Sequence, residues 1–221
     1  MGKQNKMLVL KIGPPCSGKG ALGKAIAHLH GKTTTVVTMR DLILEEKKRN
    51  SEFMRVSTEF QAAGNLLPSL YIKQILKRLA STTCNAPVLF LDGAPRNADQ
   101  IIMLKHLFNQ REICIFESLA TDEHLLSVFK QTLEATDRTG REDAKDSVHN
   151  ERVQIYRHNL PAIHAACKTV GWYRYHTQAA ATLKAKVRRF EDIANRKPVK
   201  PGSFENLEEI LGLPKLNLAA A

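Results

Sequence analysis

The sequence predicts an α/β fold built on a doubly wound, parallel sheet of five strands. Short apolar runs alternate with longer stretches of helical spacing, and a glycine-rich turn directly follows the first apolar run. This alternation is typical of βαβ units, in which helices cover both faces of a parallel sheet. The chain of 221 residues is long enough to bury one core of ordinary size and to carry small insertions.

The expected strands are short runs rich in aliphatic and aromatic residues, which suit a sheet buried on both faces. In chain order they cover residues 7–12, 34–38, 88–91, 113–116 and 172–175. The expected helices are longer segments whose apolar residues recur every three or four positions. They cover residues 21–29, 42–49, 70–79, 98–108, 124–135, 147–167 and 182–194.

Two segments interrupt the alternation and are predicted to be flaps over the glycine-rich turn. Residues 41–69 carry helical patterns without a strand, and residues 136–146 are polar and separate two helical runs. The main domain is expected to end at residue 196. Residues 197–218 contain prolines and a glycine before an amphipathic stretch, as in a linker followed by a short helix. The final alanines, 219–221, resemble a cloning remnant and are left out of the fold.

The composition favours a protein that handles small anionic ligands. The formal net charge is +11, yet the Lys and Arg residues are dispersed and no aromatic pattern of an RNA-binding surface accompanies them. Such a surplus suits phosphate-bearing substrates, and we expect no nucleic acid partner. No apolar run could span a bilayer, and the N-terminus lacks a signal segment. We therefore expect a cytoplasmic protein without a membrane partner.

Cysteine and histidine spacing gives no sign of a metal centre. The four cysteines are scattered, which favours reduced thiols over zinc ligands or a disulfide framework. The eight histidines show no paired spacing with carboxylates, and we interpret them as surface or helix-face residues. Cys16 lies in the glycine-rich turn, where a small loop residue is the simpler interpretation and redox sensing is the alternative.

The glycine-rich turn has the pattern of a phosphate-binding loop. Gly13, Gly18 and Lys19 fit the form G-x-x-x-x-G-K, in which backbone N–H groups converge on a polyphosphate and the lysine reaches its outer phosphates. A surface turn can carry the same letters, but the strand before it and the helix after it favour a nucleoside triphosphate. The expected contacts are Gly13, Pro14, Pro15, Cys16, Ser17, Gly18, Lys19, Gly20 and Ala21.

A second polar pattern follows the third predicted strand. Asp92 ends this strand and Arg96 follows four residues later. Because Gly20 replaces the usual Ser or Thr of the loop, Mg²⁺ would need a carboxylate such as Asp92, acting through water. An Asp-Gly pair also ends many ordinary strands. Together with Lys19, however, the pattern favours a phosphate site in which Arg96 binds a second phosphate.

Four patterns in this order resemble the motifs of nucleoside monophosphate kinases, most closely an adenylate kinase with a short lid. They are the Gly-Lys-Gly end of the loop, Gly64-Asn65-Leu66-Leu67-Pro68, Asp92-Gly93-Ala94-Pro95-Arg96 with Gln100, and Gly140-Arg141-Glu142-Asp143 with Arg152. The resemblance covers residues 7–194. It implies a core of the P-loop NTPase type over residues 1–196, a helical acceptor-binding insertion over 39–69, a short lid over 136–146, and a monomer.

The resemblance also implies a reaction and its residues. Mg-ATP would transfer its γ-phosphoryl group to a nucleoside monophosphate. Lys19, Arg96, Arg141 and Arg152 would be the catalytic cations, and Arg138 would help to bind ATP. The acceptor would contact Met39, Arg40, Gly64, Asn65, Leu66, Leu67, Gly93, Arg96 and Gln100. Gln100 favours AMP, because an amide can both donate to adenine and accept from it, whereas similar pyrimidine-specific enzymes carry asparagine there.

Several positions depart from the family pattern. Leu44 stands where an arginine for the monophosphate is expected, and Met39 replaces a hydroxyl residue. Gln131 and Ala135 stand where two arginines precede the lid. Arg40, Arg55, Lys130 and Arg138 could supply replacement charge, or could be solvated surface cations. Two alternatives therefore stay open: a kinase for another monophosphate, and a nucleotide-binding protein with little catalysis.

Overall fold

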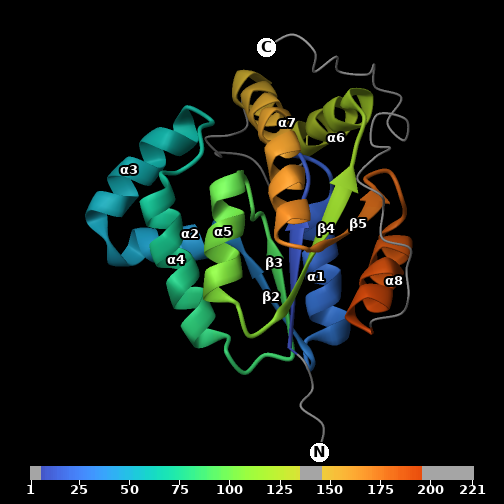
Figure 1. Cartoon of the computed structure of the whole chain (residues 1–221). Helices are drawn as coiled ribbons and strands as arrows, with labels where there is room; N and C mark the ends of the chain where they lie inside the picture. The colour runs from blue at the N-terminus through green and yellow to red at the C-terminus, as the bar shows by residue number, and fades with distance from the viewer. Residues whose placement is uncertain (1–5, 135–145, 196–221) are drawn as a thin grey trace, which may run out of the picture.

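The chain folds around a five-stranded parallel sheet with helices on both faces (Figure 1), which confirms the predicted doubly wound α/β architecture. The computed structural model describes residues 6–134 and 146–195. The sheet has the order β2-β3-β1-β4-β5. Its strands are β1 (Met7–Ile12), β2 (Thr34–Thr38), β3 (Val88–Asp92), β4 (Glu112–Leu119) and β5 (Tyr173–Gln178).

The helices form two layers on the sheet and one group beside it. One layer contains α1 (Lys19–His30) and α8 (Leu183–Ala194), and the other contains α4 (Ser69–Thr82), α5 (Ala98–Leu107) and α7 (Asp146–Thr169). Helices α2 (Met39–Arg49) and α3 (Ser51–Ala62) project from the β2 side, and α6 (Asp122–Glu134) follows β4 (Figure 1). Within the described residues, no helix combines the length and the apolar character needed to cross a membrane.

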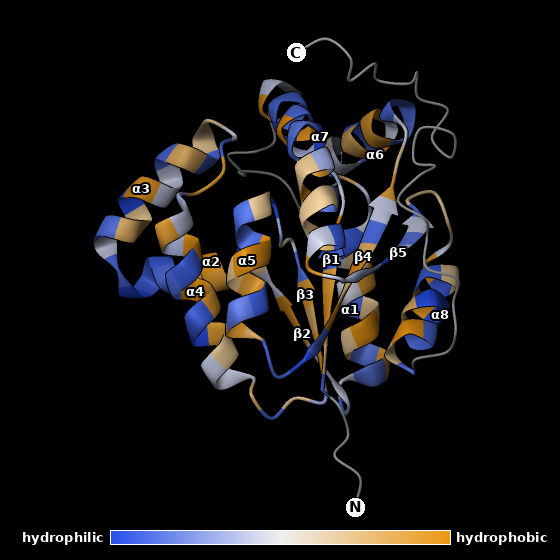
Figure 2. Ribbon diagram, viewed as in Figure 1, coloured by the Kyte–Doolittle hydropathy of each residue, from blue (hydrophilic) through white to orange (hydrophobic). Residues whose placement is uncertain are grey.

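The two faces of the sheet bury separate hydrophobic clusters, because successive side chains of a strand point to opposite faces. Leu8 and Leu10 of β1 pack into the cluster under α4, α5 and α7, while Met7 and Val9 pack into the cluster under α1 and α8. Figure 2 shows β1 and β3 in the hydrophobic colours and the helices with mixed faces. The buried central strands therefore form a rigid base for the loops at their carboxyl ends.

All five predicted strands and seven predicted helices are present, but several ends differ. β4 continues to Leu119, past the predicted end at residue 116, because its polar residues Glu117 and Ser118 are buried and hydrogen-bonded. β5 starts one residue later than predicted and extends to Gln178. Helix α3 was not among the predicted helices. It starts where the side chain of Asn50 accepts a hydrogen bond from Phe53 N (3.0 Å), which caps the helix.

A buried ionic network joins α7 to the sheet. The carboxylate of Glu117 accepts hydrogen bonds from Tyr156 Oη (3.0 Å) and Arg174 Nε (2.7 Å), and His164 Nε2 lies 3.0 Å from Oε2. Burial acts to raise the pKa of Glu117, but the hydrogen bond and charge of His164 and the charge of Arg174 outweigh it and lower the pKa. Two of these partners belong to α7, so the carboxylate holds α7 against β4 and β5.

Replacing Glu117 by Gln should lower the free energy of unfolding by about 3 kcal/mol at about pH 7, because the buried guanidinium of Arg174 would lose its carboxylate partner. Urea unfolding measures the loss. Glu59→Gln is the control. Its pair with Arg55 has side chains 61% and 66% exposed, so the loss should stay below about 1 kcal/mol. Equal losses for the two variants would contradict a structural role of the network.

The difference in free energy of unfolding between wild-type protein and the Glu117→Gln variant should depend on pH. Since the pKa of Glu117 in the folded chain lies below its unfolded value, the stabilisation is complete above the unfolded pKa and is lost as the pH falls through the folded pKa. Wild-type protein and the Glu117→Gln variant should therefore converge in stability in acid. If the two proteins instead differed by a constant free energy of unfolding across the acid range, the ionised carboxylate would not be the source of the stabilisation.

Candidate functional site

The loop between β1 and α1 wraps around the ammonium group of Lys19. Its Nζ donates to the carbonyl oxygens of Gly13 (2.9 Å) and Pro14 (2.7 Å) and lies 3.4 Å from Ser17 Oγ. A Cβ atom on Gly13 would lie only 2.8 Å from Ser17 Oγ, so a side chain there would not fit. The loop thus brings backbone N–H groups and a lysine to the N-terminus of α1, where an anion is favoured.

A cavity with a volume of about 640 Å³, the larger of the two described here, opens above this loop. It lies at the carboxyl end of β1, between β3 and β4, where ligands of open α/β sheets bind. The predicted loop residues that line it are Gly13, Pro15, Cys16, Ser17, Gly18, Lys19, Gly20 and Ala21. Pro14 does not line the cavity, and its carbonyl binds Lys19 instead.

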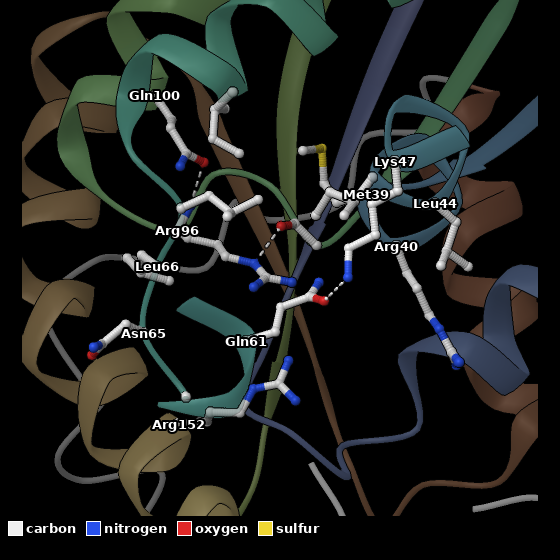
Figure 3. Close-up of a pocket in the computed structure, with 15 residues that line it drawn as sticks. Met39, Arg40, Leu44, Lys47, Gln61, Asn65, Leu66, Arg96, Gln100 and Arg152 are labelled. Atoms are coloured by element: carbon white, nitrogen blue, oxygen red, sulfur yellow. Dashed lines mark hydrogen bonds between the residues drawn. The ribbon is translucent and has the colours of Figure 1, made fainter. Parts of the chain in front are cut away.

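The smaller cavity, of about 340 Å³, lies against α2, the end of α3 and the turn after β3 (Figure 3). All nine residues predicted for the acceptor line it, namely Met39, Arg40, Gly64, Asn65, Leu66, Leu67, Gly93, Arg96 and Gln100. Four cationic side chains line it as well, and they are Arg40, Lys47, Arg96 and Arg152. The described residues around this cavity include no carboxylate, so its surroundings favour an anion.

The two cavities adjoin, because Arg96 and Arg152 are among the residues that line both. Arg96 Nε donates to the carbonyl oxygen of Gly93 (2.9 Å), which fixes the direction of the guanidinium group (Figure 3). Burial and, next, the charge of Arg152 together lower the pKa of Arg96 to about 10, against the opposing charge of Asp92. Two cations thus stand at the junction, and the charge of Arg152 disfavours the charged form of Arg96.

Gln100 is buried and has a partner that we did not predict. Its Oε1 accepts a hydrogen bond from the backbone N–H of Arg96 (2.9 Å), and its backbone N–H is bonded to the side chain of Asn97 (3.1 Å). The amide oxygen that we expected to accept from a base is therefore bonded within the protein. A base that reaches Gln100 in this arrangement would meet the donating end of the amide.

Lys19 and Asp92 both line the larger cavity and interact electrostatically. Burial, assisted by the charges of Arg96 and Arg152, lowers the pKa of Lys19 to about 8, although Asp92 opposes this shift. Burial raises the pKa of Asp92, and the charges of Lys19, Lys11 and Arg96 act in the other direction. The ionised carboxylate is thus stabilised mainly by its cationic neighbours.

Asp92 fits the predicted magnesium site in one respect. Its side chain is buried, and its Oδ1 has no hydrogen-bond partner within the described residues. A carboxylate oxygen beside a phosphate loop suits the hydration shell of Mg²⁺. Within residues 6–134 and 146–195, His, Cys, Asp and Glu side chains form no group of three that could enclose a metal ion. Water and nucleotide phosphates would therefore supply the other ligands.

Two further lysines lie beside the phosphate loop, and we did not predict them. Lys11 of β1 is fully buried and donates to Ser118 Oγ (2.7 Å), and burial together with the charge of Lys19 lowers its pKa. Lys186 of α8 donates to the carbonyl of Ala179, and its Nζ lies 3.3 Å from where a Cβ on Gly18 would be. A lysine inside an otherwise apolar run was the available signal for Lys11.

His149 is buried and lines the larger cavity from α7, so of the predicted surface or helix-face positions it occupies a helix face and not the surface. Its ring stacks on Phe129 of α6 with centroids 4.1 Å apart. Its Nδ1 lies 4.0 Å from Cys16 Sγ of the phosphate loop. Tyr156, the residue that binds Glu117, also lines this cavity. Helix α7 therefore contributes more of the cavity wall than the predicted Arg152 alone.

The residues considered as replacement cations differ in position. Arg55 pairs with Glu59 on the surface, Lys130 is exposed, and neither lines a cavity, whereas Arg40 lines both cavities. Gln131 is exposed on α6 and donates to Ser127 Oγ (3.3 Å).

Several predicted features lie outside the described residues. They are Ala135, Arg138, Arg141, lid residues 136–145, and the segments 197–218 and 219–221.

Curated adenylate kinases from bacteria are similar to this chain. The adenylate kinase of Sulfurovum sp. is 28% identical over 165 residues, which are 72% of this chain and 82% of that protein. Those of Parabacteroides distasonis and Mycolicibacterium vanbaalenii are 26% and 24% identical, over 67% and 68% of this chain and 77% and 80% of those proteins. No protein-family profile matches the sequence.

The lowered pKa of Lys19 gives a measurable effect on nucleotide binding. At about pH 8.5, binding of ATP should take up protons, because Lys19 is then largely neutral in the free protein and a phosphate favours its charged form. The affinity for ATP should fall as the pH rises through that pKa. Calorimetry in two buffers of different ionisation enthalpy counts the protons. Lys19→Met should abolish the uptake, and an unchanged uptake in this variant would contradict the assignment.

Proposed function

Since this chain is related to the nucleoside monophosphate kinases, we propose that it transfers the γ-phosphoryl group of Mg-ATP to a nucleoside monophosphate. AMP is the favoured acceptor, and two ADP molecules are the products. The observation that carries this proposal is the junction of the two cavities at Arg96 and Arg152. A donor on the phosphate loop and an acceptor in the smaller cavity would direct their phosphates toward the same two arginines.

On the donor side, the phosphate loop would position ATP. Backbone N–H groups at the start of α1 would bind its phosphates, and Lys19 would exchange the carbonyls of Gly13 and Pro14 for outer phosphate oxygens. When bound, Mg²⁺ supplies neutralising charge to these phosphates, and Asp92 is the residue that would hold its hydration shell. Lys19 would gain charge in the process, because the phosphate raises its lowered pKa.

At the junction, an oxygen of the acceptor phosphate would attack the γ-phosphorus, and the bond from that phosphorus to the bridging oxygen of ADP would break. The attacking phosphate oxygen is already anionic at neutral pH, so no general base is required. Arg96 and Arg152 would stabilise the charge that spreads over the equatorial oxygens, which is the main contribution a protein makes to this transfer. Arg138 and Arg141 would add to this charge from the lid.

The acceptor base would lie among Met39, Leu66 and Leu67 in the smaller cavity, with Gln100 at one side. The amide of Gln100 can donate to a ring acceptor such as adenine N1, while its oxygen stays with Arg96. Residues 39–69 form the proposed acceptor-binding insertion and 136–146 the proposed lid. Their closure would exclude water that would otherwise hydrolyse ATP. We further propose a cytoplasmic monomer with no nucleic acid or membrane partner.

A nucleotide-binding protein with little catalysis is the second candidate. The observation that favours it is Gln131, a neutral, exposed residue of α6 that is bonded to Ser127 rather than directed into a cavity. Without a cation at this position, ATP would bind while its transfer stayed slow. Binding and turnover must therefore be measured separately.

Turnover with ATP and AMP, GMP, UMP or CMP, measured beside calorimetric binding of each, distinguishes these functions. We expect the highest kcat/KM with AMP, since Gln100 offers its donor to adenine N1. A preference for another monophosphate would keep the kinase and correct the acceptor. Binding of ATP and AMP without turnover in the full chain would establish the second candidate and reject the first.

Arg96→Ala should raise the KM for the acceptor and lower kcat, with kcat/KM reduced by about a hundredfold, while the Kd for ATP changes little. The reason is that Arg96 stands at the junction and reaches the acceptor cavity with a fixed guanidinium. Arg55→Ala removes an exposed arginine away from both cavities and should leave all these constants unchanged. A defect confined to ATP binding would contradict this assignment and show that Arg96 binds the donor nucleotide.

A further inference from the structure

A lysine of α2 enters the acceptor cavity. Lys47 lies on the same helix face as Arg40 and Leu44, which precede it by seven and three positions, and all three line the smaller cavity. Figure 3 shows its side chain extending from α2 toward Gln61 of α3. Lys47 is half-buried, whereas the adjacent Lys48 is exposed and does not line the cavity. The two neighbouring lysines therefore stand in different surroundings.

The ammonium group of Lys47 is held by neutral oxygens. Its Nζ donates to Gln61 Oε1 (2.9 Å) and Thr58 Oγ1 (3.1 Å), both from α3. Other cations of this region, Arg55 and Arg78, form ion pairs with Glu59 and Glu46. Within the described residues, no carboxylate lies within ion-pair distance of Lys47. An ammonium group has three N–H donors, so one remains for a ligand.

The charge of the cavity also favours an anionic ligand at Lys47. Four cationic side chains surround this space, and the described lining contributes no negative charge. The mutual effect of such charges is visible in Arg96, whose pKa is lowered by burial and by Arg152. A phosphate monoester carries close to two negative charges at neutral pH, so its binding would relieve this repulsion.

We propose that Lys47 binds the phosphate of the acceptor nucleotide and is a specificity-determining residue for phosphate-bearing acceptors. This inference rests on the proposed function, because it takes the smaller cavity as the acceptor site. Thr58 and Gln61 are the positioning residues, which hold two N–H groups of the ammonium and leave the third for a phosphate oxygen. Lys47 thus supplies a positive charge from α2. The neutral Leu44, three positions earlier on this helix, supplies none.

The test compares Lys47→Met with Lys48→Met in the full chain. Calorimetry with the donor cavity saturated by a non-hydrolysable ATP analogue measures the binding of AMP and of adenosine. We expect Lys47→Met to raise the Kd for AMP by roughly tenfold or more, the usual effect of losing a charge-assisted hydrogen bond. Adenosine binding should not change, because adenosine lacks the phosphate. Lys48→Met should leave both unchanged, and Lys47→Arg should retain most of the AMP affinity.

The other outcomes overturn this inference, the proposed function, or both. Equal weakening of AMP and adenosine by Lys47→Met would show that Lys47 only joins α2 to α3, and thermal unfolding would then register the loss. Unchanged AMP binding would show that the phosphate lies elsewhere. Wild-type protein that binds AMP without transferring a phosphoryl group would reject the proposed function and leave the Lys47 comparison intact. Wild-type protein that binds no AMP would reject both.

Discussion

The central constraint on this structure is the burial of several cations together at the carboxyl end of the sheet. Lys19, Arg96 and Arg152 converge where the two cavities meet, and Asp92 is the one carboxylate among the described lining residues. Burial is the largest cause of the lowered pKa values of Lys19 and Arg96, and neighbouring cations add to it. Phosphate groups would remove that penalty, and phosphoryl transfer needs fixed positive charge of this kind. Burial and repulsion of these cations thus destabilise the empty site and favour its proposed substrates.

The rest of the fold is arranged to hold these charges in place. The buried strands fix the phosphate loop at the end of β1, β3 ends in Asp92, and the turn after β3 carries Arg96. Glu117 binds α7 through Tyr156, and α7 carries Arg152 to the junction. A buried carboxylate on one side of the sheet therefore positions a cation in the cavity, in addition to stabilising the core. The acceptor side depends on the contact of α2 with α3, which places Lys47.

The sequence was sufficient for the parts of the structure that follow from local patterns. Strand and helix order followed from apolar periodicity, and the phosphate loop followed from its glycines and Lys19. Polar residues buried by tertiary contacts were not predicted, although Lys11 inside an otherwise apolar run was a local signal for one of them. Glu117 and Lys11 occupy strand interiors because partners from distant segments bind them, and the bond from Gln100 to the Arg96 backbone depends on one turn geometry. The position of Lys47 could have been predicted to share a helix face with Arg40 and Leu44, because it repeats their helical spacing. Its entry into the cavity could not, because it depends on where α3 packs.

The central claim is that the phosphates of the donor and the acceptor meet in one continuous cavity lined by cationic side chains. The most direct measurement is calorimetric titration with a single molecule in which two adenosines are joined by five phosphates, compared with ATP and with AMP. If the cavities form one site around Arg96 and Arg152, this molecule binds once per chain, far more tightly than either nucleotide, and displaces both. Affinity no greater than that of ATP, or failure to displace AMP, would contradict the account.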